Sequence, residues 1–151
     1  MILWRISNHE TLDGVGGLSS SARWHNKGAL IVYLSESPAV AMLEVLVNYE
    51  LGPEDVPDTY KLLEVNCPEG VAISRLSNNA LPKNWNDNTD LTREIGNEWL
   101  AKNQSVLLRV PSVVVPHCNN YLFNPRHPDA NRCKILSCIN YPYDRRLFSK
   151  Q

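Results

Sequence analysis

The sequence lacks several features that would place it in a broad class of proteins. It has no apolar run of about eighteen residues, so no membrane-spanning helix is expected. The opening segment, MILWRISNHE, has no basic stretch followed by an apolar stretch, so no signal peptide is predicted and the cytoplasm is the expected location. Fifteen lysines and arginines nearly balance sixteen aspartates and glutamates. Without a basic stripe or tail, the chain itself is not expected to contact nucleic acid.

Motifs for common cofactors and nucleophiles are also missing. Gly14, Gly16 and Gly17 lie in a serine-rich segment, but no Gly-Lys-Ser/Thr follows them, so a flexible loop is favoured over a phosphate-binding loop. Ser112 is not part of a Gly-x-Ser-x-Gly motif. The histidines and cysteines match no common zinc spacing, so no metal site is predicted and a zinc site is the weaker alternative. In the cytoplasm the four cysteines are expected to be free thiols.

The length of 151 residues and the hydrophobic content of 43% predict one domain, residues 1–151. Strands are predicted at residues 2–6, 29–34, 60–65, 71–74, 105–110, 113–115 and 134–141, with another beginning at Arg23 and Trp24. Residues 119–129 are rich in asparagine and proline and are predicted to form a loop.

Two helices are predicted between these strands. The first has Ser37 as its N-cap and Pro38 as its first residue, runs to about Tyr49, and is ended by Gly52–Pro53. The second is capped by Thr89 or Asp90 and runs to residue 102. The pattern predicts a single α+β domain with a mainly antiparallel sheet and flanking helices.

Glu44 is the residue of greatest interest in the first helix, because it lies within the apolar segment AVAMLEVLV. Helical spacing places Ala41, Glu44 and Asn48 on one narrow stripe, beside a bulkier apolar stripe that includes Leu43 and Val47. One interpretation is that Glu44 points to water. The other is that the small residues leave room for a ligand, with Glu44 at the floor of its pocket.

Four further residues have a structural and a functional interpretation. Arg5 and Arg23 lie beside tryptophans, and each guanidinium is either a structural clamp or a ligand for phosphate or carboxylate. Tyr33 ends an apolar strand, where it either packs in the core or offers a flat face for stacking. Ser112 either bonds the backbone at a strand bend or offers its hydroxyl to a ligand.

Taken together, these segments resemble the RES-domain family, which is named for an arginine, a glutamate and a serine. The resemblance is carried, in order along the chain, by Leu3-Trp-Arg-Ile6, Ala22-Arg-Trp24, Lys27-Gly28, Val32-Tyr-Leu-Ser-Glu-Ser37, Ala41-Met-Leu-Glu-Val-Leu-Val47, Gly96-x-x-Trp-Leu100, Val110-Pro-Ser-x-Val-Val-Pro116 and Asn120-Tyr-Leu-Phe-Asn-Pro-x-His-Pro128. It covers nearly the whole chain.

The resemblance implies a toxin of a bacterial toxin–antitoxin pair, with a fold similar to the ADP-ribosyltransferase toxins. The partner is expected to be an Xre-type helix-turn-helix antitoxin, in a higher-order hetero-oligomer. The implied activity is depletion of NAD by cleavage of the nicotinamide–ribose bond, as a glycohydrolase or phosphorylase, with NAD as substrate and no cofactor. The alternatives are mono-ADP-ribosylation of a protein, and a non-catalytic binding module of the antitoxin complex.

The resemblance also assigns roles to residues. Glu44 is expected to stabilise the positive charge that develops on the ribose, Arg23 or Arg5 to bind the pyrophosphate, and Tyr33 to stack on the nicotinamide or ribose. Ser112 and Asn124 complete the expected substrate-binding set.

The chain departs from the family where relatives have Gly-Arg-Trp-Asn and it has Ala22-Arg-Trp-His25. The added methyl group and the histidine are expected to affect the rate and the choice of acceptor more than the class of reaction.

Overall fold

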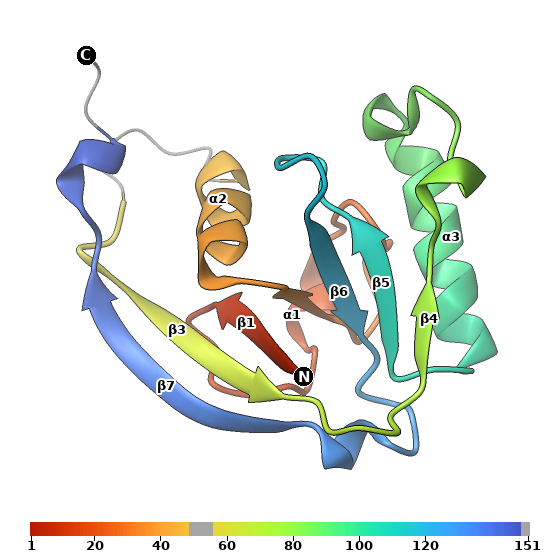
Figure 1. The fold of residues 1–151 in the computed structure, drawn as a ribbon, viewed down its shortest axis with the longest axis horizontal. Helices are drawn as coiled ribbons and strands as arrows, with labels where there is room; N and C mark the ends of the chain where they lie inside the picture. Colours follow the sequence, from red (N-terminus) through yellow and green to blue (C-terminus); the bar gives the residue numbers. More distant parts are fainter. Residues whose placement is uncertain (49–55, 149–151) are drawn as a thin grey trace.

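The computed structural model describes residues 1–48 and 56–148 and shows one mixed sheet with helices packed against it (Figure 1). In the described residues the strands are β1 (Ile2–Ile6), β2 (Val32–Ser35), β3 (Thr59–Asn66), β4 (Ile73–Arg75), β5 (Leu107–Pro111), β6 (Asn119–Phe123) and β7 (Lys134–Pro142). Their order in the sheet is β4-β5-β6-β2-β1-β3-β7. The β4–β5 pair is parallel and the other neighbours are antiparallel, which confirms the predicted α+β class with a mainly antiparallel sheet.

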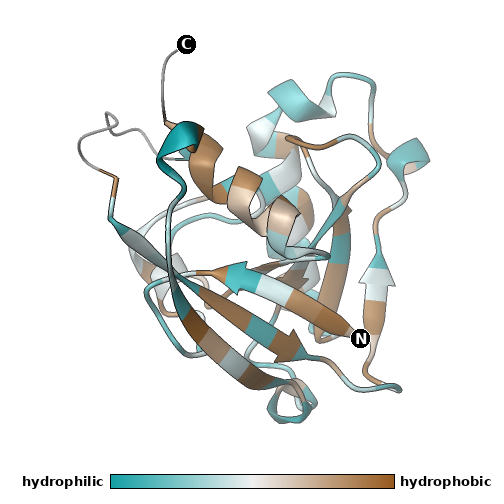
Figure 2. Ribbon diagram, turned by 60° about the vertical axis from the view of Figure 1, so that its left-hand side comes forward, coloured by the Kyte–Doolittle hydropathy of each residue, from teal (hydrophilic) through white to brown (hydrophobic). Residues whose placement is uncertain are grey.

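Three α-helices accompany the sheet in the described part of the chain: α1 (Gly16–Ser19), α2 (Pro38–Asn48) and α3 (Thr89–Lys102). The predicted start of α2 is confirmed, since the Ser37 hydroxyl accepts a hydrogen bond from the Val40 amide. Figure 2 shows this helix lying across β1, and it also contacts β2. No helix in the described ranges is long and apolar enough to span a membrane.

The two faces of the sheet bury different cores, because side chains alternate along each strand. Val32 and Leu34 of β2 belong to the first core, which lies on one face. The first core comprises Leu3, Val32, Leu34, Val65, Cys67, Val71, Val106, Leu107, Phe123 and Cys133. Tyr33 packs against the second core, on the other face, which comprises Trp24, Ile31, Trp99, Leu108, Val110 and Leu122.

Helix α3 holds the segment around Trp24 by direct backbone contact. A Cβ atom at Gly96 would lie 1.8 Å from the Trp24 carbonyl oxygen, so only glycine permits this approach. The Thr92 hydroxyl donates to the Arg23 carbonyl at 2.6 Å, and the Arg93 Nε donates to the Ala22 carbonyl at 2.9 Å. One face of α3 therefore fixes the backbone on which Arg23 is carried.

The structure corrects the prediction of a loop at residues 119–129. Its first part is β6, which lies between β5 and β2 in the sheet. Asparagine is uncommon in strands, but the side chains of Asn119 and Asn120 donate to the carboxylates of Glu36, which follows β2, and Glu44 of α2. Tertiary contacts therefore override the turn propensity of this segment.

Other element boundaries also differ from the predictions. Arg23 and Trp24 do not form a strand, since only an isolated bridge joins Ala22 and His25 there, and residues 113–115 form bends rather than a continued strand. The α3 cap is Asn88, whose side chain accepts a hydrogen bond from the Leu91 amide. The predicted end of the first helix at Tyr49 and Gly52–Pro53 lies outside the described residues.

Candidate active site

Glu44 lies in the middle of α2 and points toward the sheet. Its Oε1 accepts a hydrogen bond from the Ser112 hydroxyl at 2.8 Å and another from the Asn120 Nδ2 at 2.6 Å. Ala41, on the same stripe, is buried, whereas Leu43 and Val47 on the bulkier stripe are exposed. The interpretation that Glu44 simply points to water is therefore wrong, and Ala41 and Glu44 of the small stripe face the protein, whereas Asn48 is exposed.

Ser112 follows β5, and the interpretation that it bonds the backbone at a strand bend is confirmed. Its backbone amide donates to the Cys118 carbonyl at 2.9 Å, and its hydroxyl oxygen accepts hydrogen bonds from the amides of Val114 and Val115. Because these amides occupy its lone pairs, the hydroxyl proton is left to donate, and it points to Glu44. The bend after β5 thus fixes the hydroxyl as a donor to the carboxylate.

Asn120 is a site residue that sequence reasoning did not single out. It lies on β6 directly opposite Ser35 of β2, and the Ser35 hydroxyl donates to its Oδ1 at 2.7 Å. Directly paired residues point to the same face of a sheet, so both share the face that α2 approaches with Glu44. The available signal was the position of Asn120 at the start of the last segment that resembles the RES-domain family, but its surroundings predicted a turn.

Tyr33 shares the sheet face of Ser35, two residues along β2. Its hydroxyl oxygen accepts from the Trp24 amide at 3.1 Å and lies 2.8 Å from the His25 Nδ1. The His25 Nε2 lies 3.0 Å from the carbonyl oxygen of Ser20, which can only accept, so Nε2 carries the ring proton and Nδ1 accepts from Tyr33. The Tyr33 hydroxyl therefore both donates and accepts a hydrogen bond within the protein.

Burial affects the ionisation of both rings in this pair. It raises the pKa of Tyr33 well above its usual value, with the Trp24 amide opposing the shift. It also lowers the pKa of His25, against a smaller upward effect of the hydrogen bond to Ser20. A neutral phenol beside a neutral imidazole is the stable state near neutral pH, which matches the proton arrangement above.

Arg23 lies on the Tyr33 side of the molecule, where its positive charge acts to lower the pKa of that phenol. Its NH1 donates to the Asn86 carbonyl at 2.9 Å, which ties the guanidinium to the segment preceding α3. A guanidinium has five N–H donors, so this contact leaves others for an anionic ligand.

Arg5 is not brought together with Glu44. Trp4 is paired with Ser35, so Trp4 shares the face of the Glu44 network and the next residue, Arg5, points to the opposite face. Its NH1 donates to the Thr11 carbonyl at 2.7 Å. Burial lowers the pKa of Arg5, with the charge of Asp13 opposing this effect. The structure thus places Arg5 as a clamp on the segment that follows β1.

Asn124 also lies apart from Glu44, just beyond the far end of β6. It is buried, its Nδ2 donates to Asn103 Oδ1 at 2.8 Å, and its Oδ1 accepts from the Arg126 amide at 3.0 Å. Asn103 is the left-handed C-cap of α3, with φ of 49°. Asn124 therefore joins the end of β6 to the end of α3, and its polar atoms are occupied by this structural contact.

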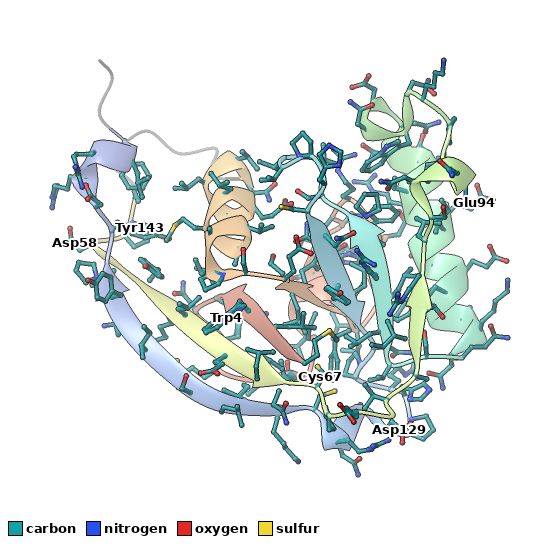
Figure 3. All side chains as sticks on the ribbon, in the orientation of Figure 1. Trp4, Asp58, Cys67, Glu94, Asp129 and Tyr143 are labelled. Carbon is teal, nitrogen blue, oxygen red and sulfur yellow. The ribbon has the colours of Figure 1, made fainter. Side chains whose placement is uncertain are left out.

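Two surface hollows lie beside helices α3 and α2. One, of about 530 Å³, lies along α3 beside Glu94, and the other, of about 130 Å³, lies between α2 and β3 beside Tyr143; both residues are labelled in Figure 3. Neither of these two hollows is lined by Glu44, Tyr33 or Arg23. The candidate site is identified by the hydrogen bonds of its side chains.

Comparisons with known proteins identify a matching family and several similar proteins. The family model described as "RES domain" matches residues 2–145. "Toxin Res" of Pseudomonas putida is 47% identical over 98% of this chain and 100% of that protein. "Prs ADP-ribosylating toxin" of Sphingobium sp. is 32% identical over 97% of this chain and 96% of that protein.

A solved structure shares the fold. A chain of the M. tuberculosis MbcT–MbcA toxin–antitoxin complex superposes with a TM-score of 0.77, covering 97% of this chain and 86% of its own, at 14% identity. The expected likeness to the wider group of ADP-ribosyltransferase toxins stays a prediction. The family match over nearly the full length, together with relatives above 30% identity, shows that this chain belongs to the RES-domain family.

Proposed function

We propose that this protein is the toxin of a toxin–antitoxin pair and depletes NAD by cleaving the bond between nicotinamide and ribose. The observation that carries the proposal is the Glu44 carboxylate, which is half-buried and held on one oxygen by Ser112 and Asn120. Membership of the RES-domain family and the toxin names of its relatives support it. The expected place of action is the cytoplasm.

The reaction suits a site with one carboxylate. Nicotinamide leaves NAD as a neutral ring, so no general acid is needed for its departure. The ribose carbon that loses the nicotinamide nitrogen develops positive charge, as in glycoside hydrolysis. A preorganised carboxylate stabilises this charge, and water or phosphate then bonds to the same carbon. Glu44 takes this role in our proposal.

The remaining residues bind and orient the substrate. The Arg23 guanidinium, carried on the backbone that α3 fixes, is proposed to bind the pyrophosphate. The Tyr33 hydroxyl is occupied by Trp24 and His25, so Tyr33 is proposed to act through its ring, by stacking on the nicotinamide or ribose. Ser112 acts through Glu44 in this arrangement. Arg5 and Asn124 support the fold around the site.

A second candidate is transfer of ADP-ribose to a protein, which the name of the Sphingobium relative favours. The two reactions share the bond that breaks and differ in the acceptor. NAD labelled in its adenosine half separates them: the label stays on a protein after transfer, and is released as ADP-ribose or its phosphate after hydrolysis or phosphorolysis.

The proposed partner is an Xre-type helix-turn-helix antitoxin that binds DNA and covers the toxin's site in a hetero-oligomer. The likeness to a chain from a toxin–antitoxin complex supports an antitoxin partner. Co-expression with an Xre-type helix-turn-helix protein that is its antitoxin should yield a stable complex in which NAD turnover is suppressed. If the two proteins elute separately and turnover continues, this partner is excluded.

The decisive experiment is to induce the chain without a partner and to measure cellular NAD. Glu44→Gln keeps the size of the side chain and removes its charge, so NAD consumption should fall by a factor of about 100 or more. Glu36→Gln is the matched control, because Glu36 also accepts from a β6 asparagine, Asn119 at 3.0 Å, but lies outside the proposed site. Equal NAD consumption by Glu44→Gln and the parent chain would contradict the proposal.

A further inference from the structure

The two oxygens of Glu44 have different environments. Oε1 accepts from both Ser112 and Asn120. Oε2 accepts no hydrogen bond from any residue in the described ranges. A carboxylate oxygen that is half-buried without a protein partner is available to a ligand, whereas Oε1 is already saturated by two donors. Oε1 of the carboxylate is thus fixed by two donors, and Oε2 is open to a ligand.

The orientation of the Asn120 amide follows from its two partners. An ionised carboxylate only accepts hydrogen bonds, so the group that Asn120 turns to Glu44 must be its NH2. The Oδ1 on the other side then accepts from the Ser35 hydroxyl, at 2.7 Å. The amide is therefore locked between β2 and α2, with its NH2 donating to Glu44.

We propose that Asn120 is the positioning residue of Glu44: with Ser112 it fixes Oε1, so that Oε2 faces the substrate ribose. This inference rests on the proposed function. It extends the site to a residue on β6 whose hydrogen bond with Glu44 is the shorter of the two. Asn120 itself does not touch the reacting atoms.

The neighbouring residue provides a matched comparison. Asn119 also donates from its Nδ2 to a carboxylate, Glu36 Oε2, at 3.0 Å. Because successive strand residues point to opposite faces, Asn119 makes the same type of contact on the other side of the sheet. If activity is lost only because a β6 asparagine has been replaced, it should fall in both Asn119→Ala and Asn120→Ala. If activity is lost because Glu44 loses a donor, it should fall only in Asn120→Ala.

The test measures kcat and KM for NAD with the purified full-length chain. In Asn120→Ala, kcat should fall by about tenfold or more, because a hydrogen bond to a charged group is lost. KM should change little. Asn119→Ala should retain the parent's kcat and KM.

Asn120→Asp gives a second readout that does not depend on lost packing. It keeps the shape of the side chain, but it removes the N–H donors and places a second carboxylate beside Glu44. The kcat should therefore fall at least as far as in Asn120→Ala, with KM again little changed. Thermal unfolding of each variant confirms that the fold is retained. If Asn120→Ala does not fold, Asn120→Asp provides the comparison.

The outcomes separate this inference from the proposed function. If the parent chain turns over NAD, Glu44→Gln is inactive, and every folded Asn120 variant keeps the parent's kcat, Asn120 is not a positioning residue. Equal losses in Asn119→Ala and Asn120→Ala would overturn the inference in the same way. If the parent does not consume NAD, or Glu44→Gln consumes it normally, the proposed function fails and this inference fails with it.

Discussion

Replacing Tyr33 by phenylalanine separates the ring of this residue from its hydroxyl. The hydroxyl accepts from the Trp24 amide at 3.1 Å and donates to the His25 Nδ1 at 2.8 Å. Both partners belong to residues that are only 3% exposed. Phenylalanine therefore leaves a donor and an acceptor without a partner in a largely water-excluded region.

The expected cost is about 1–3 kcal/mol of the free energy of unfolding, because each net hydrogen bond contributes about 1 kcal/mol and unpaired groups add a desolvation penalty. In a chain of this size each kcal/mol lowers the melting temperature by about 2–4 °C. The proposed stacking surface is unchanged, so NAD turnover at a temperature well below unfolding should stay close to the parent rate.

Thermal unfolding and steady-state NAD kinetics of Tyr33→Phe, with Tyr33→Leu beside it, check this reasoning. Tyr33→Leu loses the ring as well, and its KM for NAD should rise by about three- to tenfold. If Tyr33→Phe melts at the parent's temperature, the hydroxyl is not held as described. If it loses turnover as completely as Tyr33→Leu, the hydroxyl and not the ring serves the substrate.

Two further predictions concern the segment that carries Arg23. Gly96→Ala places a methyl group 1.8 Å from the Trp24 carbonyl oxygen, so it should lower the free energy of unfolding by about 1–3 kcal/mol or more. Gly16→Ala is the control, because open space surrounds that position and the free energy of unfolding should not fall. Urea denaturation of both variants checks this prediction. Since burial lowers the pKa of His25, the unfolded chain binds more protons there, so stability should fall as the pH drops below about 6.5. Between pH 7.5 and pH 5, the free energy of unfolding measured by denaturation should fall less for His25→Asn than for the parent chain. Equal falls in the two proteins would exclude His25 as the cause.

The sequence patterns predicted the elements whose signals are local. Ser37 and Pro38 identify the start of α2, and the apolar alternation of residues 60–65 and 134–141 identifies β3 and β7. The strand β6 was missed because its first two residues are asparagines, whose turn preference is overcome by carboxylates from distant parts of the chain.

The candidate site was predictable only in part. The resemblance to the RES-domain family selected Glu44 and Ser112, and the structure shows them in direct contact. Asn120 escaped detection because its contact with Glu44 joins residues 76 positions apart, which no local periodicity encodes. Arg5 was grouped with the site because it belongs to the family motif, but strand alternation turns it to the opposite face.

The separation of the site residues along the chain determines when the proposed site is assembled during synthesis. Glu44 is made early, but its two hydrogen-bond donors come 68 and 76 residues later. The strand that carries Asn120 must also insert between β2 and β5 before the amide reaches the carboxylate. A nascent chain that ends before β6 therefore contains Glu44 without Asn120, the later of the two donors. The proposed site is completed only when β6 has joined the sheet, late in the synthesis of the chain.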